Sequence, residues 1–363
     1  MRTVREAFAR PGNLLDMLRL AFALLVLLAH CWPITFGPER DGTLQPSVEP
    51  VLWLTRHQIF GGTLAVLCFF LLSGFLVTES FQRCRGVLDY LRRRVRRIYP
   101  GYVVAMFVTA FVLAWPFATR PGSWLAEFPW LMFLQRTATL HMCATPETFA
   151  SNPYPLQQNG SLWTIHLEFW CYLLVALLGV VGRLRSRAIL WTLFGAAFAI
   201  WNCRTILGVQ LLPPVHLIGF GNLRDWPELM TFFLAGMIVH RHGDGIPLRR
   251  DLFGLSVLCL GVSARTGGMT LALPFAGTYA VFWLAFADVS VLRMLTERRD
   301  LSYGVYLYAW PVQQTLVAAW PAVFVGAPWW LALAATPTTL GFALLSWHLV
   351  EAPFSRRKRR VVI

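Results

Sequence analysis

Two ionisable residues lie within one long apolar segment near the start of the chain. Arg19 and His30 are eleven positions apart in the segment 14–36. Eleven helical steps of about 100° return to within about 20° of the starting direction, so both side chains are predicted on one helix face, about 16 Å apart along the axis. A guanidinium and an imidazole are both costly in hydrocarbon. We therefore expect each of them to have a chemical role or a partner.

The types of these two residues indicate the chemistry that they could carry out. His30 could take a proton from a hydroxyl near neutral pH, or could itself carry a transferred group for a short time, and the sequence leaves both open. Arg19 could bind an anionic group of a substrate. Asp16, three positions before Arg19, could at the same time form a structural ion pair with it.

The composition predicts an all-α polytopic membrane protein. Hydrophobic residues make up 56% of the 363 residues, charged residues only 14%, and the mean hydropathy is +0.55. Ten apolar segments come near the length of about 20 residues that spans a bilayer. They are 14–36, 59–80, 98–117, 161–182, 188–206, 227–240, 251–266, 269–288, 301–320 and 329–350. We expect a bundle of about ten transmembrane helices that forms a single domain over 1–363, with no appended soluble domain.

The placement of basic residues predicts the orientation of this bundle. With the N-terminus inside, the inner loops hold 24 of the 32 Lys and Arg residues, and the outer segments hold seven. Such an excess is typical of cytoplasmic loops, so both termini are predicted to be cytoplasmic. The net charge of +14 is spread over these loops instead of gathering on one face, which argues against nucleic-acid binding.

The cysteines do not indicate a metal site. All seven are scattered singly, without a Cys-x-x-Cys spacing or a Cys/His cluster, so we expect no metal. Cys143 and Cys203 fall in or near predicted outer segments and could pair in an oxidising compartment. Apolar packing of single thiols is the preferred interpretation.

A second ionisable residue inside a predicted span is Glu168. In the predicted topology it lies at about the depth of His30. A carboxylate beside an imidazole would orient the ring and stabilise its protonated form. Alternatively, Glu168 binds a neighbouring helix through Ser73 or Tyr303.

Two further pairs have mainly structural interpretations. Ser73 and Gly74 are small residues of the kind that lets helices approach closely in a membrane, and a role for Ser73 in lining a substrate site is secondary. His348 and Glu351 are three positions apart at the inner end of the last span. We expect them to bond each other as a structural latch.

The predicted outer side also offers candidates for binding a polar acceptor. The stretch 118–160 is the longest without a helical pattern, it is polar over 143–159, and loops of this length are often functional. Four aromatic residues, at the inner or outer ends of their spans, could line a sugar-binding cavity or anchor the helices at the membrane interface: Trp163, Tyr303, Tyr306 and Trp310.

Several sequence blocks occur in an order that covers nearly the whole chain. They are Asp16-Met-Leu-Arg19 with His30, Phe-Phe-Leu-Leu-Ser-Gly-Phe-Leu-Val-Thr at 69–78, the basic block at 92–100, Ser-Leu-Trp-Thr-Ile-His-Leu-Glu-Phe-Trp at 161–170, and the blocks at 302–311 and 350–354. This pattern resembles the acyltransferase-3 family, bacterial inner-membrane acyltransferases that modify surface glycans. Two positions depart from the family: Ala309 stands where His is usual before Trp310, and His166 stands where small or apolar residues are common.

The resemblance implies transfer of an acyl group, most often acetyl, from cytoplasmic acyl-coenzyme A to a hydroxyl of an extracytoplasmic polysaccharide or lipid-linked oligosaccharide. Acyl-coenzyme A would be a co-substrate, with no permanently bound cofactor. His30, Glu168 and Arg19 would form the catalytic group. The phosphates of coenzyme A require cations, and besides Arg19 we expect Arg93, Arg96 and Arg97 to supply them. Equally, these arginines could be a solvated run that touches anionic lipid.

Two other functions are compatible with intramembrane charges. In a transporter or permease, Arg19, His30 and Glu168 would form an ion or proton relay. Transporters of this kind often have paired, inverted halves, and no such symmetry is visible in the sequence. The third alternative is a non-catalytic membrane partner in glycan assembly.

Overall fold

The computed structural model describes residues 2–10, 12–38, 48–213, 215–217, 220–287 and 300–355. Within these ranges the chain is mainly helical with almost no strand, which confirms the predicted fold class. Three groups of basic residues used above to predict the orientation lie outside the described residues: Arg40, those at 293–299 and those at 356–360.

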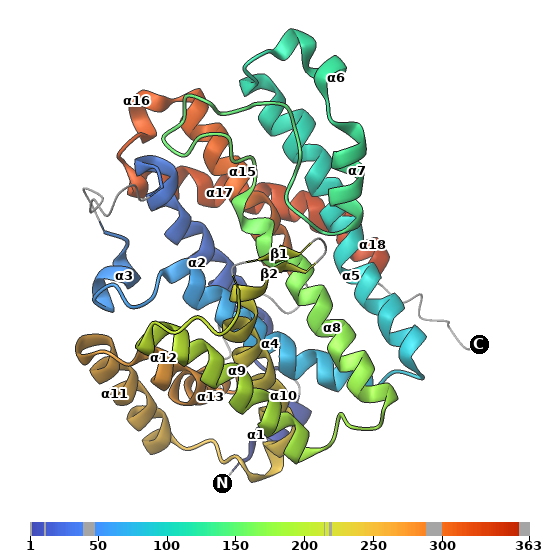
Figure 1. The fold of residues 1–363 in the computed structure, drawn as a ribbon, viewed down its shortest axis with the longest axis vertical. Coiled ribbons are helices and arrows are strands. Elements are labelled where there is room, and N and C mark those ends of the chain that lie inside the picture. Colours follow the sequence, from blue (N-terminus) through green and yellow to red (C-terminus); the bar gives the residue numbers. More distant parts are fainter. Residues whose placement is uncertain are drawn as a thin grey trace. The chain divides into compact units, whose positions relative to one another are not determined.

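The helices are drawn in Figure 1, and the connections between them range from a few residues to the stretch between Ala138 and Gly160. In chain order they are α1 (Val4–Ala9), α2 (Leu15–Phe36), α3 (Pro50–Leu54), α4 (Gly61–Gln82), α5 (Val87–Val108), α6 (Trp124–Glu127), α7 (Trp130–Ala138), α8 (Ile165–Val180), α9 (Arg187–Leu207), α10 (Trp226–His242), α11 (Arg250–Thr266), α12 (Met269–Ala272), α13 (Thr278–Ala285), α15 (Ser302–Ala319), α16 (Pro321–Phe324), α17 (Pro328–Ser346) and α18 (Ala352–Ser355). The strands β1 (His216–Leu217) and β2 (Gly221–Asn222) pair antiparallel.

Six helical segments are long and apolar enough to cross a membrane, judged by length and composition. They are Leu15–Phe36, Gly61–Gln82, Val87–Phe117, Gly160–Val180, Arg187–Leu207 and Pro328–Phe354. The other four predicted spans are also helical, but α10, α11 and α15 have only 17 or 18 residues and Met269–Ala285 is likewise short. A helix of 17 residues is about 26 Å long, less than the roughly 30 Å of a hydrocarbon core. The count of ten therefore stays a prediction.

The stretch 118–160 is more regular than predicted. It contains α6 and α7, and only the part from Thr139 to Asn159 has no helix of its own. The reason lies in α7, where Phe133 and Thr137, four positions apart, are both buried on one face. This short amphipathic helix within the stretch 118–160 was not predicted from the sequence.

The described residues divide into two compact units. The first comprises Met1–Ala29, Val48–Tyr90 and His166–Arg298, and the second comprises His30–Ser47, Leu91–Ile165 and Arg299–Ile363. In the first unit α10 packs along α4 and α9, and in the second α15 packs along α17.

Glycines bring α4 and α10 of the first unit into direct backbone contact (Figure 1). A Cβ atom on Gly74 of α4 would lie 1.9 Å from the carbonyl oxygen of Phe233. Conversely, a Cβ atom on Gly236 of α10 would lie 2.0 Å from the carbonyl oxygen of Leu71. The close-packing interpretation of Gly74 is therefore confirmed by the geometry.

In the second unit the polar segment 139–159 is fastened to α15. The side-chain amide of Asn152 donates to the carbonyl oxygen of Gln314 at 3.0 Å and to its Oε1 at 2.8 Å. The Asn159 amide donates to the carbonyl oxygen of Leu307 at 2.8 Å. These buried bonds fix a segment that has no regular structure of its own.

The glycine contact leads to a stability prediction. Gly74→Ala and Gly236→Ala should each force α4 and α10 apart and destabilise the protein by about 1–3 kcal/mol, because neither backbone can move away alone. We expect the detergent-solubilised variants to melt several degrees below the wild type. Gly254→Ala is the control, since nothing lies within 4 Å of a Cβ atom at that position of α11. Equal melting temperatures for all three variants would contradict this account.

Candidate functional site

His30 lies near the end of α2 and contacts an indole. Its ring and that of Trp310 on α15 meet edge to face, with centroids 4.9 Å apart and planes at 74°. The Tyr154 ring meets the same indole from the segment 139–159, at 5.1 Å and 90°. His30 is half-buried and Trp310 is buried. The predicted base is thus restrained by an aromatic side chain from a distant part of the sequence.

The position of Trp310 is itself fixed by backbone groups. Its indole N–H donates to the carbonyl oxygen of Gln157 at 3.1 Å, and Gly160 packs so closely that a Cβ atom there would lie 2.9 Å from the ring. The Gln314 amide also donates to the Gln157 carbonyl, at 2.9 Å. The polar segment that was predicted to help bind an acceptor therefore holds the residue that contacts His30.

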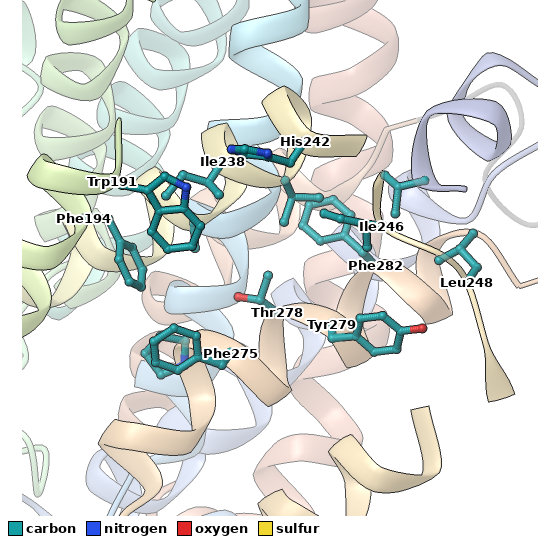
Figure 2. A pocket seen from close by; sticks show the side chains of 14 residues that line it. Trp191, Phe194, Ile238, His242, Ile246, Leu248, Phe275, Thr278, Tyr279 and Phe282 are labelled. Atoms are coloured by element: carbon teal, nitrogen blue, oxygen red, sulfur yellow. The ribbon is translucent and has the colours of Figure 1, made fainter. Parts of the chain in front are cut away.

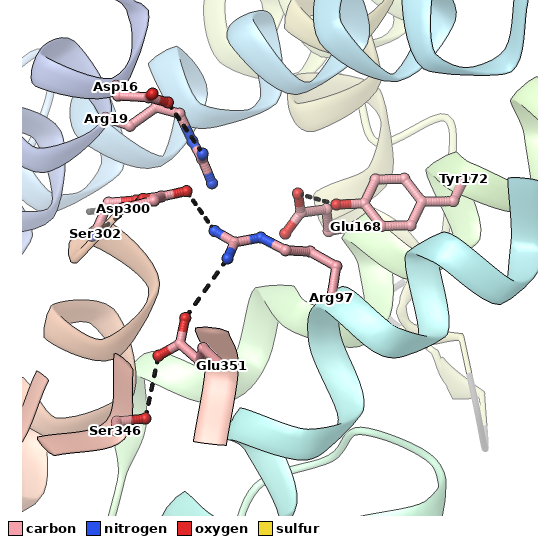
Figure 3. A network of polar contacts seen from close by, with 9 residues as sticks. All are labelled: Asp16, Arg19, Arg97, Glu168, Tyr172, Asp300, Ser302, Ser346 and Glu351. Carbon is pink, nitrogen blue, oxygen red and sulfur yellow. Dashed lines mark hydrogen bonds and ion pairs between the residues drawn. The ribbon is translucent and has the colours of Figure 1, made fainter. Parts of the chain in front are cut away.

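A second polar group in this unit surrounds Arg97 (Figure 3). Its guanidinium forms ion pairs with Asp300 at 2.5 Å and with Glu351 at 3.5 Å. It also lies over the ring of Tyr303, with 5.5 Å from Cζ to the centroid, and the Tyr303 hydroxyl donates to the carbonyl oxygen of Ile98 at 2.9 Å. Arg97 thereby joins α5 to α15 and to the end of the last span.

The expected bond between His348 and Glu351 is not formed within the described residues. The segment Trp347–Glu351 is π-helical, and Glu351 accepts instead from the hydroxyl of Ser346, five positions earlier, at 3.0 Å. A π-helix bonds residues five apart, so the spacing of three no longer places both side chains on one face. His348 is exposed, whereas the Glu351 carboxylate is buried.

The remaining candidates of the second unit are Arg93, Arg96, Trp163 and Tyr303. Arg93 is half-buried and Arg96 exposed on α5. Trp163 is half-buried in the 3-10 turn Gly160–Thr164 before α8. Tyr303 uses its hydroxyl and ring in the contacts around Arg97 described above.

The first unit holds the other two ionisable candidates, drawn in Figure 3. The Glu168 carboxylate accepts from the hydroxyls of Ser73 at 3.1 Å and of Tyr172 at 2.6 Å. Arg19 forms the expected ion pair with Asp16, at 3.8 Å. The helix contact of Glu168 through Ser73 is thus present, and its pairing with His30 stays a prediction.

An apolar cavity of about 330 Å³ opens in the first unit (Figure 2). Aromatic and aliphatic side chains of α9, α10 and α13 line it, among them Trp191, Ile238 and Phe282. A nucleotide or sugar requires convergent polar groups, which this lining hardly offers. We therefore do not assign the cavity to the reaction.

The cysteines are all free, including Cys143 and Cys203. Cys143, outside the spans, is buried, and this burial raises the pKa of its thiol to about 12 although Arg136 lowers it. Since the thiolate is the reactive form, Cys143 is not a nucleophile at neutral pH.

Several residues at these groups were missed in the sequence. Tyr172 follows Glu168 by four positions, a helical spacing that could have indicated their bond. Tyr154 and Gln157 lie in the polar stretch that was singled out, but nothing local indicated that they would contact Trp310. Asp300 is 203 positions from Arg97, so no sequence pattern links the two.

The contacts of Arg97 lead to a second stability prediction. Arg97→Gln removes the ion pairs with the buried Glu351 carboxylate and with Asp300 and should cost about 3 kcal/mol or more. The double variant Arg97→Gln/Glu351→Gln should recover part of the lost melting temperature, because the uncompensated charge is gone. Arg96→Gln, an exposed neighbour on the same helix, should be nearly neutral. If Arg97→Gln melts like Arg96→Gln, the ion pairs do not stabilise this unit.

Comparison with known proteins adds independent information. The chain matches a family model described as "Acyltransferase domain" over residues 13–348. It is 26% identical to the "O-acetyl transferase" of Shigella phage Sf6, over 95% of this chain and 97% of that protein. It is also 26% identical to "Nodulation protein 10" of Rhizobium leguminosarum bv. viciae, over 96% of this chain and 95% of that protein.

A further relative is "Putative peptidoglycan O-acetyltransferase YrhL" of Bacillus subtilis (strain 168), which is 26% identical over 90% of this chain and 57% of its own length. No solved structure matches the chain significantly. Because the family model covers nearly the whole chain, and because long apolar helices carry its sequence blocks, this protein belongs to the acyltransferase-3 family of membrane acyltransferases.

Proposed function

We propose that this acyltransferase moves an acyl group, with acetyl as the first expectation, from cytoplasmic acyl-coenzyme A to a hydroxyl of an extracytoplasmic polysaccharide or glycolipid at the bacterial inner membrane. The observation that carries the proposal is His30, an imidazole in a membrane-spanning helix that is held against Trp310. The names of two relatives support it, since one states O-acetyl transfer and the other names peptidoglycan as the acceptor. Membership in the family leaves the transporter alternative without support.

In the proposed reaction His30 acts as the base. A sugar hydroxyl is too weakly acidic to attack a thioester unaided, and the imidazole accepts its proton as the oxygen attacks the carbonyl carbon. The new C–O bond forms, the C–S bond breaks, and the proton passes to the thiolate, so that coenzyme A leaves as the free thiol. An alternative mechanism stays open, in which His30 first takes the acyl group and then passes it to the alcohol.

The donor is proposed to bind through cations. Arg19, Arg93 and Arg96 are assigned to its phosphates, because guanidinium groups bind phosphate oxygens in pairs of hydrogen bonds. Arg97 is assigned a positioning role, since Asp300 and Glu351 already hold its guanidinium.

The acceptor is proposed to bind near the polar segment 139–159, with Trp310 and Trp163 as the aromatic residues that line its path. Ser73 and Tyr303, also predicted to line the substrate, have structural hydrogen bonds and take a lesser part.

The first test is the loss of the base. His30→Ala should lower the amount of O-acetyl groups on the surface polysaccharide by at least about 100-fold, which is the usual contribution of a general base. The groups are counted by NMR after the gene is deleted and restored as wild type or variant. His348→Ala is the matched control, because that histidine is exposed and lies outside the group around His30.

Recovery of acetylation with His30→Ala would end the catalytic assignment. Unchanged acetylation after deletion would show that the acceptor is a different molecule.

A second test concerns the charge of Glu168. Glu168→Gln keeps an acceptor for the Ser73 and Tyr172 hydroxyls but removes the negative charge. If that charge stabilises the protonated imidazole, the initial rate of acyl transfer should fall at least about tenfold, with little change in melting temperature. Tyr172→Phe, which removes one hydrogen bond and keeps the charge, should lose less than about threefold. A fully active Glu168→Gln would reduce this residue to a contact between helices.

A further inference from the structure

A cationic cavity lies at one end of the first unit. It has a volume of about 280 Å³ and is lined by Arg5, Gln82, Arg185, His240 and Arg241. These residues come from α1, the last residue of α4, the turn between α8 and α9, and the end of α10. The excess of basic residues predicts this end to be cytoplasmic.

Two of the three arginines have no acidic partner in the part of the chain that the structure describes. Within the described residues, neither Arg185 nor Arg241 forms an ion pair with a carboxylate. Arg241 is held beside the turn that carries Arg185, since its Nε donates to the backbone carbonyl oxygen of Arg185 at 2.9 Å, while the Arg185 side chain is exposed. Two neighbouring cations without a counter-charge among the described residues attract an anion.

The other two ionisable residues of the cavity, Arg5 and His240, have structural contacts. Arg5 pairs with the exposed Asp244 at 3.3 Å and donates through Nη2 to the carbonyl oxygen of His240 at 3.0 Å. His240 is buried, and its Nε2 lies 2.7 Å from a carboxylate oxygen of Glu79. Its buried Nδ1 has no hydrogen-bond partner among the described residues. These contacts position the side of the cavity that Arg5 and His240 form.

A solvated run of arginines would look different. The basic residues of such a run point separately into water, and each is surrounded by its own hydration shell. Here the arginines come from three separate parts of the sequence and enclose one space. Arg83 adds a further positive charge that acts on His240, and it is paired with Glu79.

We propose that this cavity binds a phosphate ester. Phosphate oxygens accept charge-assisted hydrogen bonds from several guanidinium groups at once, which suits Arg185 and Arg241. Two sources offer this group at the cytoplasmic surface: the nucleotide end of acyl-coenzyme A, which rests on the proposed function, and the headgroup of an anionic phospholipid, which does not.

The test uses the full-length protein in phosphatidylcholine nanodiscs. Binding of coenzyme A, of dephospho-coenzyme A and of pyrophosphate is measured by calorimetry, and retention of added phosphatidylglycerol is counted by native mass spectrometry. The variants are Arg185→Gln and Arg241→Gln. Arg183→Gln is the matched control, since Arg183 is exposed in the same turn and does not line the cavity. Melting temperatures show whether each variant is folded.

If the cavity binds the donor, both variants should bind coenzyme A and pyrophosphate at least about tenfold more weakly, which is the effect of losing one charge-assisted hydrogen bond. The affinities of Arg183→Gln should stay within about twofold of those of the wild type. A smaller loss for dephospho-coenzyme A would identify the 3′-phosphate as the bound group. If the site takes lipid, coenzyme A affinity stays the same and retained phosphatidylglycerol falls in the two variants only. Unchanged affinity and unchanged lipid retention in folded variants would overturn the proposal.

These readouts are separate from acyl transfer. His30→Ala should lose transfer and keep the binding of pyrophosphate and coenzyme A. If the wild type transfers no acyl group but Arg185→Gln reduces the binding of lipid or pyrophosphate, the proposed function is wrong and the proposed binding site stands.

Discussion

A charge inside an apolar helical protein needs a partner, and this requirement accounts for the long-range polar contacts of both units. Arg97 lies between Asp300 and Glu351, and His240 lies against Glu79, 161 positions away. Removing one member of such a group leaves the other charge in a medium of low dielectric constant, which costs far more than an exposed pair contributes. Each contact therefore determines which helices are neighbours and in what register they pack. Apolar side chains alone determine this register only weakly.

Apolar packing contributes a second constraint in the first unit. Side chains such as leucine gain little from leaving lipid for the protein, so close backbone approach becomes the main source of attraction between spans. Gly74 and Gly236 provide that approach between α4 and α10. The same pair of helices ends at the cationic cavity, where α4 contributes Gln82 and α10 contributes His240 and Arg241.

His30 contacts an aromatic ring, whereas Arg97 and His240 contact carboxylates. The immediate aromatic neighbour of His30 is the Trp310 indole, which is oriented by the backbone of the segment 139–159. The edge-to-face contact with the indole restricts the orientation of the imidazole ring. The segment 139–159, proposed to bind the acceptor, thus contacts Trp310, which in turn contacts the proposed base His30.

The sequence by itself determined the helical class, the positions of six apolar helices long enough to span a membrane, and the family. It also identified Arg19, His30 and Glu168, because an ionisable residue in an apolar run is visible without any structure. The Asp16–Arg19 pair and the close packing at Gly74 were predictable for the same reason, since both depend on local spacing or residue size.

Only the tertiary structure decided which distant groups meet. Trp310 was a candidate by type, but its contacts with His30, Tyr154 and Gln157 join segments of the chain that no periodicity relates. The His348–Glu351 bond failed because the prediction assumed α-helical spacing, whereas the π-helical turn pairs Glu351 with Ser346. Helical periodicity is a local property of the backbone, while the partner of a buried charge depends on how whole helices pack.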